Sequence, residues 1–316
     1  MMTKIALLFP GQGSHAVGMG KLLSETSTAA RAVFHEVDDA LGFSLTDIMW
    51  NGPEEELVLT AHAQPAIMSC SMAVLAMIKE QMGDNVMSGI DVVLGHSLGE
   101  YSAYCAVGAI DLSTTAKLLR LRGEAMQAAV PQGEGKMAAI LGLDVEQIEQ
   151  VCKEVSQTSV VVLANDNSVG QAVISGAAEG VLKASTILSE KGAKKVVPLN
   201  VSAPFHSPLM APATAVMRDA LEKTNVGPVT TPVLCNVDVQ PITNPESAVD
   251  GLVRQVEGRV RWRESVAWLA ENEYTHCLEI GHGKVITGMI KRQLRGAVCA
   301  SIGSHEDVKI LEEALR

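Results

Sequence analysis

One serine occupies a short glycine-flanked segment whose pattern suits nucleophilic catalysis. Residues 95–99 read Gly-His-Ser-Leu-Gly, after the apolar run 90–94 and before the small-residue segment 100–108. In this strand-turn-helix context, G-x-S-x-G lifts the serine hydroxyl above a sheet edge, and the helix N-terminus offers free N–H groups to an oxyanion. The pattern predicts that Ser97 is a nucleophile. The alternative is a glycine-rich turn with an incidental serine.

A serine nucleophile needs a base, and His206 is the best placed of the eight histidines. It lies in the loop 202–208, where prolines on both sides restrict the backbone, as a positioned base requires. His96 adjoins Ser97, so its side chain is expected to point away from the hydroxyl. The alternative for His206 is an ordinary loop histidine, and no acid stands out as the third member of a triad.

An arginine on the apolar face of a helix is the second chemical feature. Arg122 follows Leu118 by four residues and precedes Met126 by four, inside the apolar stripe of a helix expected over 114–130. Arg120 lies on another face. A buried guanidinium is costly unless it is paired. It is therefore either half of a structural ion pair or a bidentate clamp for a substrate carboxylate.

A second glycine-containing loop, FPGQGS at 9–14, follows the first apolar run. It mimics a dinucleotide-binding fingerprint only weakly, because Asp38 and Asp39 lie in a helical pattern rather than at the end of a second strand. We interpret it as a tight loop that brings the backbone N–H of Gln12 to the oxyanion site. The second donor is then the N–H of Leu98, the residue after the nucleophile.

Strands alternating with helices must position these residues. Apolar runs predict strands at 4–9, 90–94, 232–237 and 276–280. Helical patterns cover 19–41, 65–82, 113–130, 208–223, 248–256, 265–271 and 285–294. The alternation predicts an α/β fold, with a parallel sheet covered by helices on both faces.

The middle of the chain follows a different order. Residues 136–201 read β-α-β-β-α-β, the pattern of a ferredoxin-like unit, between Gly133 and Pro204. We therefore expect a small domain at 131–203, inserted into a larger domain formed by 1–130 and 204–316. A chain of 316 residues agrees with two domains at roughly 150 residues each.

Composition excludes several classes of protein. The net charge of −11 argues against nucleic acid or an anionic membrane as the main partner. The six cysteines form no C-x-x-C pair, which favours reduced thiols in a cytoplasmic protein. The uncharged stretch 57–78 contains Gln64 and Pro65 and is expected to be a buried helix rather than a membrane span. The apolar run 5–9 is too short for a signal peptide. We expect no metal site.

Seven segments together resemble the malonyl-CoA:acyl-carrier-protein transacylases of bacterial fatty acid synthesis and, more distantly, the acyltransferase domains of polyketide synthases. The resemblance covers essentially the whole chain. The segments are FPGQGS (9–14), QPA (64–66), GHSLGE (95–100), RGEAMQ (122–127), PFHS (204–207), LVRQ (252–255) and TGMIKR (287–292). It implies an α/β-hydrolase-like large domain with a parallel sheet, plus an inserted ferredoxin-like small domain.

The resemblance also implies catalytic roles. Ser97 is expected as the nucleophile, His206 as its base and Arg122 as the residue that binds the free carboxylate of malonyl. Gln255 is expected beside His206, because the family orients its histidine through a backbone carbonyl near that glutamine. This arrangement would explain the missing acid of the triad.

The remaining implied roles concern the oxyanion and the acyl group. The backbone N–H groups of Gln12 and Leu98 would form the oxyanion hole. Gln64 and Phe205 would contact the substrate, and the Phe205-His206 pair resembles malonyl-selective members of the family.

The expected function is transfer of malonyl from malonyl-CoA to the phosphopantetheine thiol of holo-acyl carrier protein, through a malonyl-serine intermediate. No cofactor is expected, because the carrier brings its own phosphopantetheine. The alternatives are a serine thioesterase or esterase, an acyltransferase serving a polyketide pathway, and a non-catalytic subunit that binds the carrier. A group of basic residues forms either a docking patch for an acidic carrier or a solvated face. These residues are Arg259, Arg261, Arg263, Lys284, Lys291, Arg292 and Arg295.

Overall fold

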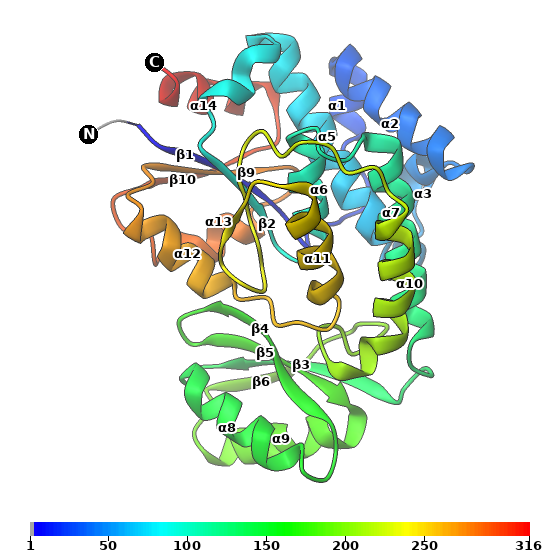
Figure 1. The fold of residues 1–316 in the computed structure, drawn as a ribbon, viewed down its shortest axis with the longest axis vertical. Coiled ribbons are helices and arrows are strands. Elements are labelled where there is room, and N and C mark those ends of the chain that lie inside the picture. The colour runs from blue at the N-terminus through cyan, green and yellow to red at the C-terminus, as the bar shows by residue number, and fades with distance from the viewer. Residues whose placement is uncertain (1–2) are drawn as a thin grey trace.

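The structure, a computed structural model, describes residues 3–316, and its strands form two separate sheets (Figure 1). The larger sheet has six strands, in the spatial order β10 (Val298–Ile302), β9 (His276–Ile280), β1 (Ile5–Phe9), β2 (Val92–Gly95), β7 (Val233–Leu234) and β8 (Pro241–Ile242). All neighbours in it run parallel except β7 and β8. The predicted α/β fold is therefore confirmed, and the predicted parallel sheet is found except at the antiparallel pair β7–β8.

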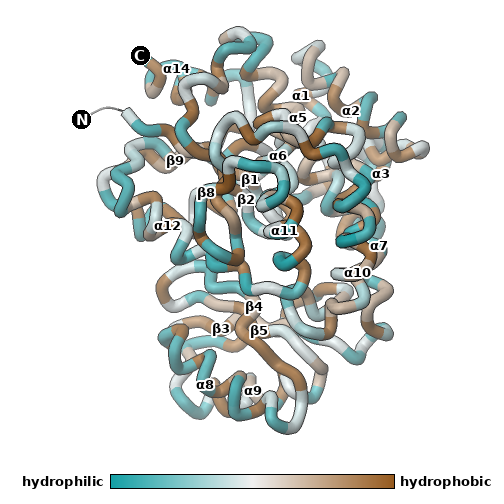
Figure 2. The backbone as a smooth tube through the Cα atoms, viewed as in Figure 1, coloured by the Kyte–Doolittle hydropathy of each residue, from teal (hydrophilic) through white to brown (hydrophobic). Residues whose placement is uncertain are grey.

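The central strand β1 explains why helices cover both faces of this sheet. All five of its residues are buried. Leu7 and Phe9 pack into one apolar cluster, whereas Ala6 and Leu8 pack into another on the opposite face. A strand that is apolar on both sides must be covered on both sides. Figure 2 shows the hydrophobic strands enclosed by helices whose outer surfaces are more polar.

The helices of this larger part pack around the sheet (Figure 1). They are α1 (Lys21–Thr26), α2 (Thr28–Leu41), α3 (Leu45–Asn51), α4 (Glu54–Leu57), α5 (Thr60–Met82), α6 (Leu98–Ala106), α7 (Leu112–Ala128), α10 (Ala211–Glu222), α11 (Pro245–Gln255), α12 (Trp262–Glu271), α13 (Val285–Ile290) and α14 (Val308–Ala314). Short 3-10 helices cover Asp84–Gly89, Pro208–Met210 and His305–Asp307.

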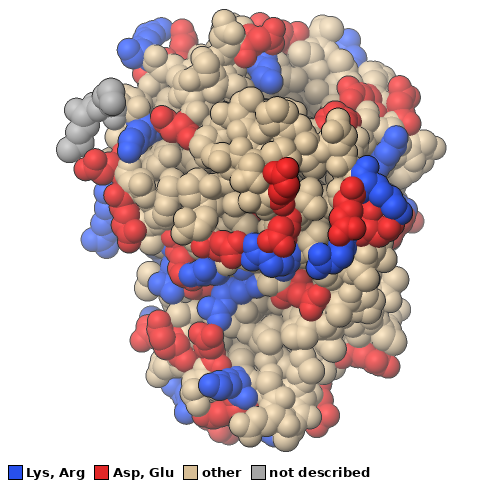
Figure 3. Space-filling view, in the orientation of Figure 1, with Lys and Arg blue, Asp and Glu red and all other residues tan. Residues whose placement is uncertain are grey.

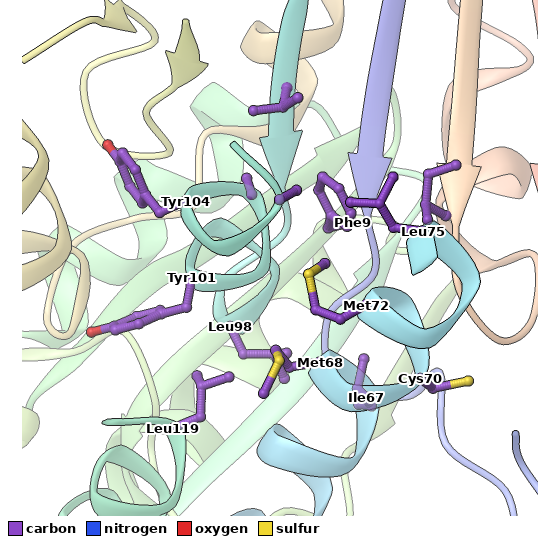
Figure 4. Packing of buried hydrophobic residues seen from close by; sticks show 14 of the residues in the cluster. Phe9, Ile67, Met68, Cys70, Met72, Leu75, Leu98, Tyr101, Tyr104 and Leu119 are labelled. Atoms are coloured by element: carbon purple, nitrogen blue, oxygen red, sulfur yellow. The ribbon is translucent and has the colours of Figure 1, made fainter. Parts of the chain in front are cut away.

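Helix α5 is the long uncharged helix of the core. It is long and apolar enough to cross a membrane, but 89% of its most apolar window is buried inside the protein. Figure 4 shows Ile67, Met68 and Met72 of this helix packed beside Phe9 of β1 and Leu98 of α6. The predicted start at Pro65 is wrong, since the helix begins at Thr60. The Ala61 carbonyl, which Pro65 cannot satisfy, accepts a hydrogen bond from Arg120 Nη1 at 3.3 Å.

The predicted helix over 19–41 is two helices. Ser27 ends α1 and begins α2, where its hydroxyl accepts a hydrogen bond from Ala30 N at 3.0 Å. A serine at this position caps the free N–H groups of α2 and thereby favours a new helix start over continuation of α1.

The smaller sheet is antiparallel and has its own core. Its order is β4 (Val161–Ser168), β5 (Gln171–Ala177), β3 (Gly135–Leu141) and β6 (Lys195–Pro198). Helices α8 (Val145–Val155) and α9 (Ala178–Glu190) cover it with a separate apolar cluster that includes Ile140, Val151 and Leu188. In Figure 1 this unit lies at the opposite end from the chain termini.

Strand β4 joins the small sheet to the larger part. Its backbone forms an isolated parallel bridge from Asn165 to Val260, with hydrogen bonds Asp166 N to Val260 O at 3.0 Å and Val260 N to Ala164 O at 2.9 Å. The buried Asp166 carboxylate also pairs with Arg263 at 2.9 Å. These contacts hold the small sheet beside the carboxyl ends of β1 and β2, where the predicted site residues lie.

Candidate active site

Ser97 lies in a strained turn between β2 and α6. Its backbone has φ 53° and ψ −110°, a conformation that costs an L-residue about 1–3 kcal/mol. Glycine is needed at positions 95 and 99 because neither position has room for a Cβ atom. A Cβ on Gly95 would lie 1.9 Å from the Gly99 carbonyl carbon, and one on Gly99 would lie 2.3 Å from the Phe9 oxygen of β1. This geometry is that of a nucleophile elbow.

The structure brings Ser97 and His206 together across 109 residues of sequence. The Ser97 Oγ lies 2.8 Å from His206 Nε2. His206 Nδ1 lies 2.9 Å from the backbone oxygen of Gln255. A carbonyl can only accept, so Nδ1 carries the hydrogen and Nε2 presents its lone pair to the serine. A backbone carbonyl thus occupies the place that a triad acid would take.

His206 is neutral in this environment. Its side chain is buried, and burial together with the nearby Arg122 guanidinium lowers the pKa of His206 to about 3. Burial also lowers the pKa of His96, which bonds through Nε2 to Asn167 Oδ1 at 2.8 Å rather than to the Ser97 hydroxyl. His206 is therefore ready to accept the serine proton at neutral pH.

Arg122 is buried, as its place in the apolar stripe of α7 predicts, and is only 2% exposed. Its Nη1 donates to Gln64 Oε1 at 2.8 Å, and its Nη2 donates to Gln255 Oε1 at 2.8 Å and to Ser97 Oγ at 3.2 Å. The guanidinium is thus held beside the nucleophile by neutral oxygens.

The structural ion pair that was the alternative for Arg122 is not formed. None of the ion pairs found within residues 3–316 includes Arg122. Burial lowers the pKa of Arg122, an effect that Tyr101 and Glu100 oppose. A buried cation held by two amides and a hydroxyl, with no carboxylate paired to it, is a site suited to an anion. By contrast, Arg120 on the same helix is half-buried and pairs with Glu124.

Gln255, at the end of α11, connects these groups. Its backbone oxygen holds His206, its Oε1 holds Arg122, and its Nε2 donates to the Ser97 carbonyl at 2.9 Å and to Glu100 Oε2 at 2.8 Å. Glu100 is fully buried, and burial raises its pKa to about 7. One glutamine therefore holds His206 and Arg122 together.

Two backbone N–H groups are available to an oxyanion. Leu98 begins α6 and Gln12 lies in the loop after β1, and in the part of the chain described neither N–H has a hydrogen-bond acceptor. Gly11 allows the close approach of this loop, because a Cβ there would lie 2.6 Å from the His96 oxygen. Both donors lie on elements that meet at the nucleophile.

Two adjoining cavities open at this point between the sheets. The inner one, of about 300 Å³, contains all the predicted side chains that face substrate. They are Gln64, Ser97, Arg122, Phe205 and His206. The outer one, of about 720 Å³, shares Gln12, His96 and Asn167 with it and reaches Arg292 and Arg295. Within residues 3–316, no group of three or more His, Cys, Asp or Glu is arranged to bind a metal ion.

The predicted basic group divides into two sets. Arg259, Arg261 and Arg263 are paired with Glu149, Glu264 and Asp166, so the solvated face, rather than the docking patch, is the better interpretation for these three. Figure 3 shows basic and acidic side chains interleaved in a band where the two parts meet. The other set, Lys284, Lys291, Arg292 and Arg295, takes part in none of the ion pairs of the described chain.

Sequence reasoning missed two residues of the site. Glu100 stands three residues after Ser97 as the only charged residue of α6, a signal that could have been used. Asn236 follows β7, and its side chain accepts from Ser97 N at 2.8 Å and donates to the Gly95 oxygen at 2.7 Å. Nothing in its local sequence marks it.

Comparison with known proteins agrees with this geometry. Residues 6–315 match the family model described as the acyl transferase domain. The malonyl CoA-acyl carrier protein transacylase of Bacillus subtilis (strain 168) is 42% identical over 318 residues, covering 100% of this chain and 98% of the relative.

Two solved structures extend the similarity to the fold. The acyl-carrier-protein S-malonyltransferase of Bartonella henselae superimposes with a TM-score of 0.96 at 49% identity, over 99% of each chain. A malonyl-transacylase solved in complex with its holo type II PKS acyl-carrier protein has a TM-score of 0.93 at 39% identity, over 98% of this chain and 99% of that one. The chain therefore belongs to the acyl transferase domain family, within which its full-length relatives are malonyl CoA-acyl carrier protein transacylases.

Proposed function

We propose that this protein transfers a malonyl group from malonyl-CoA to the phosphopantetheine thiol of holo-acyl carrier protein, which supplies extender units for fatty acid synthesis. The observation that carries the proposal is the buried, unpaired Arg122, whose Nη2 lies 3.2 Å from the Ser97 hydroxyl. An acyl group with a free carboxylate places its negative charge on this guanidinium when its thioester carbonyl reaches the serine. A neutral acyl group leaves the cation unpaired.

The first half of the reaction acylates the serine. His206 Nε2 takes the proton of Ser97, and Oγ attacks the thioester carbonyl carbon of malonyl-CoA. The oxyanion then accepts hydrogen bonds from the N–H groups of Gln12 and Leu98, each of which contributes about 3 kcal/mol to the transition state. The carbon–sulfur bond breaks, the CoA thiolate takes the proton from His206, and malonyl-Ser97 remains.

The second half repeats the route with another thiol. The phosphopantetheine thiol of the carrier gives its proton to His206, and its sulfur attacks the Ser97 ester. The serine oxygen leaves and recovers a proton from His206. The two thiols thus use the same site in turn, which predicts ping-pong kinetics.

The outer cavity supports this use of two thiols. Both CoA and the carrier's prosthetic group carry phosphate, and both must place a thiol arm in the same passage. Arg292 and Arg295 line the outer cavity, and Val285 and Met289 give it an apolar wall. We propose that Arg292, Arg295, Lys284 and Lys291 dock the acidic carrier, although the chain as a whole has a charge of −11.

The finer features of the fold support related proposals. The small unit has the strand order β4-β5-β3-β6 and its own core, which supports a ferredoxin-like domain at 131–203 inserted into an α/β-hydrolase-like domain of 1–130 and 204–316. All six cysteines are free thiols, which favours a cytoplasmic protein.

Radiolabelled malonyl-CoA tests the proposal directly. The enzyme is expected to acquire one label, which a Ser97→Ala variant does not acquire. The isolated malonyl-enzyme should lose its label slowly in buffer and rapidly when holo-carrier is added. Rapid spontaneous loss would instead identify a thioesterase, and an absence of labelling would identify a non-catalytic carrier-binding protein.

A further inference from the structure

The backbone of Ser97 does not hold its strained conformation unaided. The parallel pairing of β2 with β7 is recorded at Val93 and Val233 and does not extend to the turn. Beyond it, the side chain of Asn236 takes the place of a neighbouring strand. Its Oδ1 accepts from Ser97 N at 2.8 Å, and its Nδ2 donates to the Gly95 oxygen at 2.7 Å.

Asn236 is itself fixed on both sides. Its backbone N donates to Glu100 Oε2 at 3.2 Å, and its backbone oxygen accepts from Arg261 N at 3.0 Å. The side chain is 1% exposed, so its hydrogen bonds face little competition from water. The same Glu100 oxygen accepts from Gln255 Nε2. One carboxylate oxygen therefore contacts both Asn236, which holds the turn, and Gln255, whose backbone oxygen holds His206.

The two bonds of Asn236 have a consequence for the oxyanion site. Since the N–H of Ser97 is already engaged, only the N–H of Leu98 remains free on this turn. A turn held at residues 95 and 97 also fixes the direction of the Ser97 Cβ, and therefore the 2.8 Å approach of Oγ to His206. Asn236 contributes to neither cavity wall, so it acts on the substrate only through the turn.

We propose that Asn236 is a positioning residue that holds the nucleophile turn in its reactive conformation. This inference rests on the proposed role of Ser97 as the nucleophile, but not on the identity of the acyl group. The side chain substitutes for the missing strand hydrogen bonds, and it stabilises a backbone conformation that Ser97 would otherwise leave.

The test separates serine reactivity from substrate recognition. A neutral fluorophosphonate reports the reactivity alone: Ser97 Oγ bonds to phosphorus, fluoride leaves, and His206 accepts the proton. The Asn236→Ala variant is expected to label at least tenfold more slowly than the wild type. Asn236→Asp, which keeps an oxygen acceptor for Ser97 N but loses the donor to the Gly95 oxygen, should label at an intermediate rate. Asn272→Ala is the matched control, because within residues 3–316 its side-chain amide bonds only the Trp268 carbonyl, at the C-terminal end of α12.

A second measurement distinguishes positioning from general loss of structure. Single-turnover acylation gives the ratio of the rates with malonyl-CoA and acetyl-CoA. This ratio should stay within twofold of wild type in Asn236→Ala, because the contacts of Arg122 do not involve Asn236. Labelling of Asn236→Ala within twofold of wild type would overturn the proposal. So would a ratio that collapses in parallel with the labelling rate. If wild type labelled with fluorophosphonate but did not transfer malonyl, the proposed function would fail while the role of Asn236 could still be read.

Discussion

Replacing Arg122 by methionine is expected to abolish the preference for a carboxylated acyl group without unfolding the protein. Methionine keeps an unbranched apolar stem in the space that the arginine stem fills, and it removes the charge. The same change at Arg120, two residues away on α7, is the matched control, because that guanidinium pairs with Glu124 and lines neither cavity.

The magnitude follows from the surroundings of the guanidinium. Removing one partner of a buried, hydrogen-bonded charge pair costs about 2–5 kcal/mol. At 1.4 kcal/mol per factor of ten, kcat/KM for malonyl-CoA should fall about 30-fold to several thousand-fold. In the same variant, kcat/KM for acetyl-CoA should stay the same or rise, because an acetyl group no longer leaves a buried guanidinium unpaired.

Stability should respond less than activity. In the free enzyme Arg122 is 2% exposed and bonded to neutral oxygens, so its desolvation is not repaid by a carboxylate. Its hydrogen bonds offset that cost at about 1.5–3 kcal/mol each, and methionine leaves the buried Oε1 atoms of Gln64 and Gln255 without this donor. Because these effects oppose each other, the melting temperature of the methionine variant is expected to stay close to that of the wild type.

The assay is the transfer of labelled malonyl or acetyl from CoA to holo-carrier, with thermal unfolding measured on the same samples. Equal losses with the two donors would refute the carboxylate clamp. A large fall in melting temperature would show instead that Arg122 is structural. The Arg120 variant should change neither the ratio of the donors nor the carrier dependence.

Three further predictions concern the base, the turn and the docking surface. The pKa of His206 is lowered to about 3 in the folded protein, whereas its value in the unfolded chain is near 6.5. Between these two pH values the unfolded state binds more protons than the folded state. The free energy of unfolding therefore falls as the pH drops below about 6.5. Relative to His206→Gln, wild type should lose about 2 kcal/mol more between pH 7.5 and pH 5 by urea unfolding, and parallel curves would contradict this. Gly99→Ala should destabilise the fold by about 1–3 kcal/mol, because its Cβ meets the backbone of β1 at 2.3 Å, whereas Gly288→Ala in α13 has nothing within 4 Å and should not. Charge reversal of Arg292 and Arg295 together should raise KM for the carrier severalfold and remove its salt dependence, and an unchanged KM would exclude them from docking.

Sequence by itself predicted the features that depend on neighbours along the chain. The elbow at Ser97 is a contiguous strand, turn and helix, and the need for Gly95 follows from its contact with Gly99 in the same turn. The inward direction of Arg122 follows from the 3.6-residue period of α7, and the two-sided burial of β1 follows from an uninterrupted apolar run. The β-α-β-β-α-β order of residues 136–201 is likewise a property of local periodicity.

Only the tertiary structure decided which distant segments meet. Asn236 bonds to Ser97 across 139 residues, and Gln255 bonds to Glu100 across 155. It also placed amides rather than an acid around Arg122, and acids beside Arg259, Arg261 and Arg263, for which the sequence had left a docking patch and a solvated face open. Helical and strand periods determine which face of an element is buried, but not which side chain lies opposite. The opposite side chain depends on sheet order and on the packing of α11, β4 and β7 around the nucleophile, which no local pattern contains.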